Sequence, residues 1–282
     1  MILIAESGST KCDWRIIDKT KSVLHQFQTL GINPMVLGSR ELKKVLENEK
    51  ALANNKEQIE KIYFFGAGCG TPETDEKLKK ILQDFFSPDI QIQIKGDLDA
   101  AVEAATTQSG IVCILGTGSN CCFFDGTKII QKNPSLGYML GDEGSGNAIG
   151  KALLKAYFNQ LMPVTLQAKF ETTFTPQLEE VLIQLYQRPF PNKYLAGFAR
   201  FAIENRNKPF INLMLNQELK KFIDKQLYAY QEELKKYPTH FIGSIAYYTQ
   251  DLIIEEFKNR DYQIGTFIKS PIDQLTQSII QD

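Results

Sequence analysis

The sequence has few of the residues that build a disulfide or zinc scaffold. Its 282 residues include five cysteines, at positions 12, 69, 113, 121 and 122, and no CxxC spacing. An odd number of cysteines, most of them in apolar segments, indicates neither a disulfide framework nor a zinc site. Cys121 and Cys122 are adjacent in an expected strand, so their side chains point to opposite faces and cannot hold one metal ion together.

Excess charge and long apolar runs are also missing. The 32 Lys and Arg residues balance 33 Asp and Glu residues, and a net charge of −1 provides no electrostatic attraction for nucleic acid or a membrane surface. No run reaches the roughly 18 apolar residues that a membrane span requires. Met1 leads directly into an apolar segment, which argues against a signal peptide. We therefore expect a cytoplasmic protein that binds neither nucleic acid nor membrane, large enough for two domains.

The most informative feature that the sequence does contain is a pair of strand–turn–strand segments. Residues 110–127 contain an apolar strand, the turn Gly116-Thr117-Gly118-Ser119 and a returning apolar strand, and residues 1–18 repeat this pattern around a turn at 6–11. Backbone N–H groups and hydroxyls in such turns can bind phosphate, although most glycine-rich hairpins are only turns. Two such segments, about a hundred residues apart, predict a duplicated domain with the two phosphate-facing turns opposed across a cleft.

The order of the other segments favours an α/β fold. Residues 1–107 alternate strands with amphipathic helices, and the same scheme after Gln108 carries a helical insertion over about 165–237. The pattern ends with a strand at 263–267 and a helix at 271–281. We expect an N-terminal domain at 1–108 and a C-terminal domain at 109–282, with the final helix free to pack back on the N-terminal domain.

The two turns and the pentad Gly141-Asp142-Glu143-Gly144-Ser145 resemble those of the ATPase fold shared by sugar kinases, actin and heat-shock chaperones. Within it, the chain is most similar to the BadF/BadG/BcrA/BcrD-type ATPases and their relative, N-acetylglucosamine kinase. The resemblance covers essentially the whole chain and implies two duplicated ribonuclease-H-like domains with a nucleotide cleft between them.

The same resemblance implies a function. It points to a kinase that uses ATP and Mg²⁺ to phosphorylate a hydroxyl of an amino sugar such as N-acetylglucosamine. The alternative is a BadF-type ATPase that drives a partner protein, like the activators of 2-hydroxyacyl-CoA dehydratases. Those activators share an iron–sulfur cluster held by cysteines, and no obvious cysteine pair for it occurs here. The aromatic-rich helices of the insertion could form a homodimer face.

The resemblance also assigns cofactor-binding residues. They are the turn residues Ser7, Gly8, Ser9, Thr10, Gly116, Thr117 and Gly118, together with Gly144 and the pair Gly243-Ser244 under the adenosine. Glu6 stands where sugar kinases and actins usually carry Asp, and an acid there helps to hold Mg²⁺. Ser7 and Ser9 replace two of the usual glycines, which leaves the individual phosphate contacts open.

Further residues are implied to contact the sugar. They are Asn33, Asp97, Ser119, Asn120, Ser135, Leu136, Gly137 and Asp142. Without the resemblance, Asn33 would be interpreted as a loop residue before proline and Asp142 as a helix cap.

Two carboxylates compete for the role of the catalytic base. Asp97 and Asp99 both lie at a helix start, where an N-cap role is the ordinary explanation. In the kinases a D-A-A helix start carries the Asp that takes the proton of the sugar hydroxyl, and matching those letters selects Asp99. When the residues before Gly116 are aligned with the kinases without gaps, the base falls on Asp97 instead. The D-L-x-x-A pattern of BadF-like sequences also begins at Asp97. We therefore assign the base to Asp97.

Overall fold

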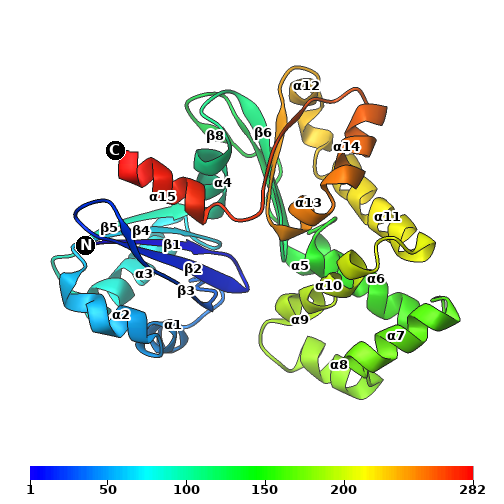
Figure 1. Ribbon diagram of the computed structural model, residues 1–282, viewed down its shortest axis with the longest axis horizontal. Helices are drawn as coiled ribbons and strands as arrows, with labels where there is room; N and C mark the ends of the chain where they lie inside the picture. The colour runs from blue at the N-terminus through cyan, green and yellow to red at the C-terminus, as the bar shows by residue number, and fades with distance from the viewer. Residues whose placement is uncertain (282) are drawn as a thin grey trace. The chain divides into compact units, whose positions relative to one another are not determined.

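The computed structural model describes residues 1–281, which divide into two compact units. The first unit is Met1–Thr107 together with the C-terminal segment that begins at Ser270, and the second is Gln108–Lys269. Each unit contains one five-stranded sheet and several helices (Figure 1). The α/β class predicted from the sequence is confirmed.

The first unit is built on a mixed sheet. Its elements are β1 (Ile2–Ser7), β2 (Lys11–Ile17), β3 (Val23–Leu30), α1 (Ser39–Glu47), α2 (Lys50–Asn55), the 3₁₀ turn η1 (Lys56–Gln58), β4 (Lys61–Gly66), α3 (Pro72–Phe85), β5 (Gln91–Gly96), α4 (Asp97–Ala105) and, from the end of the chain, α15 (Ile272–Gln281). The strand order is β3-β2-β1-β4-β5. The first three strands are antiparallel, whereas β4 and β5 are parallel to β1.

The second unit repeats this topology. Its elements are β6 (Gly110–Leu115), β7 (Ser119–Phe124), β8 (Ile129–Ile130), α5 (Gly137–Leu140), α6 (Gly146–Phe158), α7 (Val164–Phe174), α8 (Leu178–Tyr186), α9 (Pro191–Gly197), α10 (Ala199–Glu204), α11 (Pro209–Lys225), the 3₁₀ turn η2 (Tyr228–Tyr230), α12 (Gln231–Leu234), β9 (Thr239–Ile242), α13 (Ser244–Tyr248), α14 (Gln250–Asn259) and β10 (Ile264–Ile268). The strand order β8-β7-β6-β9-β10 matches that of the first unit, with the same parallel and antiparallel pairings.

The last helix of the chain completes the core of the first unit. In α15, Ile272 packs with Ile4 and Ile17, and Leu275 packs with Phe65 and Ala100. The helix runs beside α4 (Figure 1). Because all of these side chains are buried, their removal from water stabilises the return of the chain to this unit.

The structure differs from the expected elements in two places. Within the helical insertion expected over about 165–237, α11 ends at Lys225 and the 3₁₀ turn η2 follows, where the hydroxyl of the buried Tyr230 donates to the carbonyl of Cys121, 3.1 Å away. The first turn begins at Gly8 rather than Glu6. Glu6 and Ser7 remain in β1, where they pair with Asp13 and Cys12 of β2.

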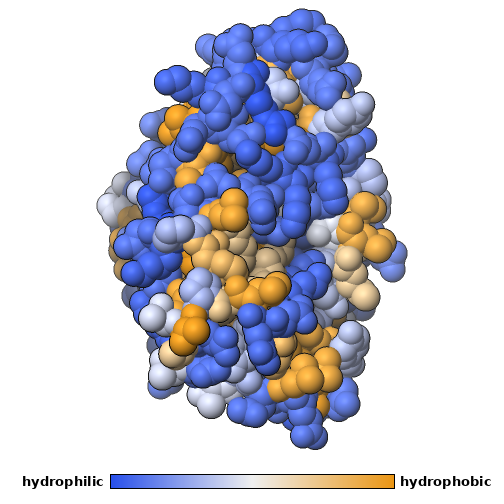
Figure 2. Space-filling view, turned by 90° about the vertical axis from the view of Figure 1, so that its right-hand side faces the viewer, coloured by the Kyte–Doolittle hydropathy of each residue, from blue (hydrophilic) through white to orange (hydrophobic). Residues whose placement is uncertain are grey.

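The surface is mainly hydrophilic. On the face drawn in Figure 2, apolar side chains emerge in separate groups among hydrophilic residues. Two of the most exposed apolar side chains, Met139 and Leu140, belong to the short helix α5. In the part of the chain that the structure describes, no helix combines the length and the hydropathy needed to cross a membrane.

His240 is a buried histidine in β9. Its Nδ1 accepts a hydrogen bond from the main-chain N–H of Thr266, at 3.2 Å, so the neutral ring carries its proton on Nε2. That Nε2 atom has no hydrogen-bond partner among the described residues. Burial lowers the pKa of His240 below its ordinary value of 6.5.

We predict that His240 makes the fold sensitive to acid. As the pH falls below about 6.5, the unfolded chain binds a proton at this residue while the folded chain does not, so the free energy of unfolding falls. The slope from one such group is at most about 1.4 kcal/mol per pH unit. Urea unfolding at pH 7, 6 and 5 gives the free energy of unfolding at each pH. This free energy should fall less with decreasing pH for His240→Gln than for the wild type. The control is His25→Gln at an exposed position of β3, and equal slopes in all three proteins would contradict the prediction.

Candidate active site

The predicted residues of the first unit gather at one edge of its sheet. Ser7, Gly66 and Gly96 are neighbours across β1, β4 and β5. These are the carboxyl ends of three parallel strands, the edge at which open α/β sheets bind ligands. Asp97 follows immediately as the first residue of α4. Glu6, the first turn and Asp97 are therefore brought to the same edge.

The first turn is tied to the loop that carries Asn33. The N–H of Gly8 donates to the carbonyl of Lys11 (3.0 Å), and the N–H of Gly31 donates to the carbonyl of Thr10 (3.2 Å). The buried Ser7 hydroxyl accepts from the N–H of Ile32 (2.8 Å) and lies 3.1 Å from its carbonyl. The hydroxyl of Ser7 thus holds the Asn33 loop beside the turn.

Acidic side chains concentrate beside this turn. Glu6 and Asp13 are cross-strand neighbours in β1 and β2. Burial, followed by repulsion from Asp13, raises the pKa of Glu6 to about 7. Asp13 is buried, but its carboxylate pairs with Lys11 at 2.7 Å and accepts from Gln28 at 2.5 Å. Asp13 was missed in the sequence, although the hairpin register places it opposite Glu6.

These acids fit a magnesium ion held mainly by water and phosphate. Carboxylate oxygens are the ligands that Mg²⁺ prefers, and it commonly takes only one or two from the protein. Within residues 1–281, no three His, Cys, Asp or Glu side chains converge as a complete metal cage. Among the described residues, the partly buried Glu6 carboxylate forms no ion pair, and the charge of Lys11 only partly opposes the rise in its pKa, so a bound cation would favour its charged form.

Asp97 and Asp99 have different local roles. The N-cap of α4 is Gly96, and Asp99 accepts its main-chain N–H at 2.9 Å. The interpretation of Asp97 as the cap is therefore wrong, and Asp99 does the capping. Burial raises the pKa of Asp97 to about 6, although main-chain hydrogen bonds oppose the shift.

In the second unit, Asp142 fixes the turn at 116–119. Its buried carboxylate accepts from the N–H of Ser119 (3.0 Å) and from the side-chain amide of Asn147 (2.9 Å). Asp142 has a φ of 62°, which is unusual for a residue other than glycine. A Cβ atom on Gly118 would lie 2.8 Å from this carboxylate, so only glycine lets the turn approach so closely.

Asn147 is a residue that the motif analysis missed. Besides Asp142, its side-chain amide reaches the carbonyl of Thr117 at 2.9 Å, and its main-chain N–H reaches the same carbonyl at 3.0 Å. Its Oδ1 and the Oγ of Ser119 are buried without hydrogen-bond partners among the described residues. The sequence feature that could have identified Asn147 is its position directly after the pentad and Gly146, at the start of α6.

The other predicted nucleotide residues lie near the ends of β6 and β9. A Cβ atom on Gly243 would lie 2.4 Å from the carbonyl oxygen of Leu115, so the main chain before α13 packs directly on the start of the second turn. Ser244 then opens α13. Gly144 lies between Asp142 and Gly146, which both bond the second turn, and it packs against Phe222 of α11.

Four other residues are predicted to contact the sugar. Three of them lie at the start of α5, and Asn120 lies in β7. Ser135 and Leu136 are exposed, and Gly137 begins the helix. Lys151 of α6 donates to the carbonyl of Tyr138 at 2.7 Å and so supports this segment. Asn120, in β7, uses its side-chain oxygen to accept from Gln131 at 2.8 Å.

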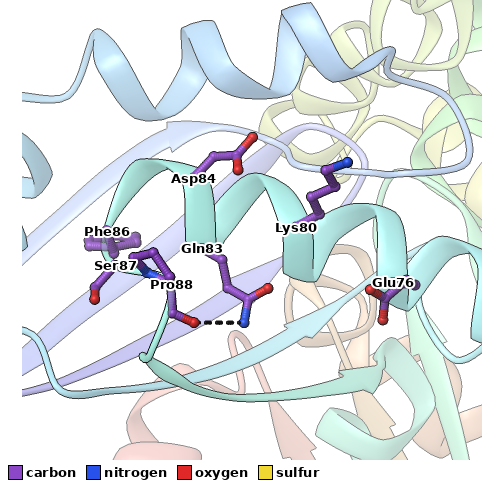
Figure 3. Close-up of a pocket in the computed structure, with 7 residues that line it drawn as sticks. All are labelled: Glu76, Lys80, Gln83, Asp84, Phe86, Ser87 and Pro88. Carbon is purple, nitrogen blue, oxygen red and sulfur yellow. Dashed lines mark hydrogen bonds between the residues drawn. The ribbon is translucent and has the colours of Figure 1, made fainter.

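A separate hollow lies along the outer face of α3 (Figure 3). It is lined by Glu76, Lys80, Gln83, Asp84, Phe86, Ser87 and Pro88. One hydrogen bond, from the Gln83 amide to the Pro88 carbonyl (3.1 Å), crosses it. None of the motif residues lines this hollow, so it is not the candidate active site.

The fold defines a class of protein. Two units with the same strand order, each with a turn rich in Gly, Ser and Thr after its first strand, form the architecture of actin-like ATPases and ROK sugar kinases. A ROK family glucokinase from Streptomyces griseus, solved with glucose and AMPPNP, has this fold. It matches with a TM-score of 0.59 at 13% identity over 100% of this chain and 99% of that chain.

The chain belongs to the BadF/BadG/BcrA/BcrD ATPase family, whose model matches residues 6–264. A solved structure described as a "Putative N-acetylglucosamine Kinase" from Porphyromonas gingivalis is 35% identical, with a TM-score of 0.91 over 100% of this chain and 99% of that chain. A protein of the same description from Chromobacterium violaceum shares the fold at 14% identity, with a TM-score of 0.70 over 100% and 98%. The resemblance inferred from the motifs is confirmed.

We predict that neutralising Glu6 stabilises the metal-free protein at alkaline pH. Its pKa of about 7 exceeds the ordinary 4.5, so ionisation costs the folded state stability as the pH rises between these values. Glu6→Gln should therefore raise the free energy of unfolding at pH 8 by about 1–3 kcal/mol, an effect that shrinks toward pH 4.5. Urea titrations measure it, with Glu47→Gln on exposed α1 surface as the control. A destabilised Glu6→Gln protein at pH 8 would contradict the prediction.

We also predict that Asn147 supports the second turn. Asn147→Ala removes the donor to Asp142 and Thr117 in a buried site and should cost about 2–4 kcal/mol of unfolding free energy. Asn159→Ala, at the exposed C-terminal end of the same helix, should change it by less than about 0.5 kcal/mol. Thermal or urea unfolding compares the two variants, and similar effects from both would count against this role.

Proposed function

We propose that this protein is an ATP-dependent sugar kinase that phosphorylates a hydroxyl of an amino sugar such as N-acetylglucosamine. The observation that carries the proposal is the carboxylate of Asp97. It lies at the carboxyl edge of the sheet that also holds Glu6, and burial raises its pKa to about 6. A base with a pKa just below the working pH is ionised and still accepts a proton readily. The similarity to the Porphyromonas gingivalis protein supports the choice of acceptor.

The two turns are proposed to bind the phosphates of ATP. Ser7 to Thr10 would do so in the first unit, and Gly116 to Gly118 in the second, through main-chain N–H groups and the hydroxyls of Thr10 and Thr117. The Ser7 hydroxyl is already bonded to Ile32, so its contribution would be indirect. Gly243 and Ser244 would lie under the adenosine, and Gly144 is proposed to contact the nucleotide.

Glu6 is proposed to help hold Mg²⁺, with water between them. The ion would neutralise charge on the β- and γ-phosphates during transfer. Asp13, the cross-strand neighbour of Glu6, would add negative potential that attracts the ion, and the ion pair with Lys11 would offset part of it. The protein residues otherwise position the reactants, which is the main requirement of phosphoryl transfer.

The sugar is proposed to contact side chains of both units. Asn33 and Asp97 would contribute from the first unit. Ser119, Asn120, Asp142 and the segment Ser135-Leu136-Gly137 would contribute from the second. The carboxylate of Asp142 has further lone pairs beyond the two that Ser119 and Asn147 occupy, so it could still accept from a sugar hydroxyl. Asp97 would take the proton of the attacking hydroxyl.

The decisive experiment is an ATP-consumption screen of the purified protein with Mg²⁺ over a panel of sugars. The panel should include N-acetylglucosamine, N-acetylmuramic acid, glucosamine and glucose. Turnover that depends on one amino sugar, with a sugar phosphate as product, is the expected result. ATP hydrolysis indifferent to every sugar would instead favour a family ATPase that drives a partner protein.

We predict that Asp97→Asn lowers kcat by roughly 10²–10⁴-fold, because the amide cannot accept the proton, while ATP affinity stays near that of the wild type. Wild-type kcat/KM for the sugar should rise with pH around an apparent pKa of about 6, as Asp97 of the free enzyme ionises. Asp99→Asn is the matched control, since an amide oxygen can still accept the N–H of Gly96. If Asp99→Asn lost activity and Asp97→Asn kept it, the base would be Asp99.

A further inference from the structure

The loop that carries Asn33 buries Ile32, Pro34 and Leu37, and between them it relies on hydrogen bonds of its own. The N–H groups of Val36 and Leu37 donate to the carbonyl of Asn33, at 3.2 and 2.9 Å, and that of Met35 donates to its Oδ1 at 3.0 Å. Met35 and Val36 are more than half exposed. Because Oδ1 is used within the loop, contact with a ligand would fall to the side-chain NH₂ group of Asn33.

Two features hold the beginning of this loop. The Ser7 hydroxyl bonds the main chain of Ile32, as described above. Gly31 lies so close to the first turn that a Cβ atom there would be 2.4 Å from the carbonyl oxygen of Gly8. Both contacts act before Asn33. After it the side chains of Pro34 and Leu37 are buried, and the carbonyls of these two residues need a separate polar support.

Lys77 of α3 supplies that support. Its Nζ donates to the carbonyl of Pro34 and to that of Leu37, each at 2.7 Å. Hydrogen bonds from an ammonium group are stronger than those between neutral groups. In the described part of the chain, no carboxylate lies within ion-pair distance of this ammonium group. Its charge is therefore satisfied by loop carbonyls and the remaining solvent.

We propose that Lys77 is a positioning residue that fixes the loop at 33–37, and with it the Asn33 side chain, for binding of the acceptor sugar. The kinetic part of this proposal rests on the proposed function. Lys77 itself contacts neither the phosphate turn nor Asp97 in the described hydrogen bonds, so its effect is expected on acceptor binding rather than on nucleotide binding.

The kinetic experiment compares Lys77→Met, Lys77→Arg and Lys79→Met in the full chain. Methionine keeps most of the stem and loses the donor, whereas arginine keeps donors of a different geometry. Lys79→Met removes a lysine from the exposed face of the same helix. With N-acetylglucosamine as the acceptor, Lys77→Met should raise its KM roughly 10- to 100-fold and that of ATP by less than about threefold. Lys77→Arg should recover part of the loss, and Lys79→Met should match the wild type.

Hydrogen–deuterium exchange tests the same role without any substrate. Lys77→Met should speed exchange of the amides of 35–37 by roughly tenfold or more, with the rest of the first unit unchanged. Exchange equal to that of Lys79→Met, or faster exchange throughout the unit, would overturn the proposal. Faster loop exchange with an unchanged KM for the sugar would also overturn it, because the loop would then not position the acceptor. If no sugar is phosphorylated by the wild type, the proposed function fails, and the exchange result still decides whether Lys77 holds the loop.

Discussion

A carboxylate that is wholly or partly removed from water must find hydrogen-bond donors or a cation, and the candidate site depends on how two buried and two partly buried carboxylates meet this requirement. Asp142 is satisfied by the N–H of Ser119 and the amide of Asn147. Asp13 is satisfied by Lys11 and Gln28. The negative charges of Glu6 and Asp97 are offset less completely by donors and cations, and burial raises the pKa of both. Asp142 and Asp13 therefore hold the structure together. Glu6 and Asp97 retain an affinity for a cation or a proton, which the proposed catalysis would use.

The duplicated topology carries two kinds of turn. In the second unit the turn is locked by Asp142 and by Asn147, both from the segment that leads into α6. In the first unit the hydroxyl of Ser7 and the close approach of Gly31 join the turn to the Asn33 loop. One strand order thus supports a rigid turn in the second unit and, in the first, a turn coupled to the loop proposed to bind the sugar.

The sequence predicted the architecture well because it depends on local patterns. Two apolar strand–turn–strand segments and alternating helices predicted the α/β class, and the two turns with the pentad at 141–145 carried the resemblance to the family. It also placed Asp97 between the end of a strand and the start of a helix, but it put Glu6 and Ser7 in the first turn, whereas both belong to β1. It could not assign Asn147, Asp13 or Lys77, since their contacts join residues that lie far apart in the chain or across a hairpin. The capping of α4 by Asp99 was equally hidden, because it depends on which residue first adopts helical geometry.

The two segments proposed to contact the sugar share one structural device. Lys77 donates to carbonyls of the loop after Asn33, and Lys151 donates to the carbonyl of Tyr138 beside the segment 135–137. Each lysine comes from a helix packed in the same unit as its loop. Lysine suits this purpose, since its long apolar stem packs along the helix while its ammonium group reaches main-chain carbonyls of any nearby sequence. Such a support fixes the backbone of each loop through main-chain carbonyls and does not depend on which side chains the loop carries.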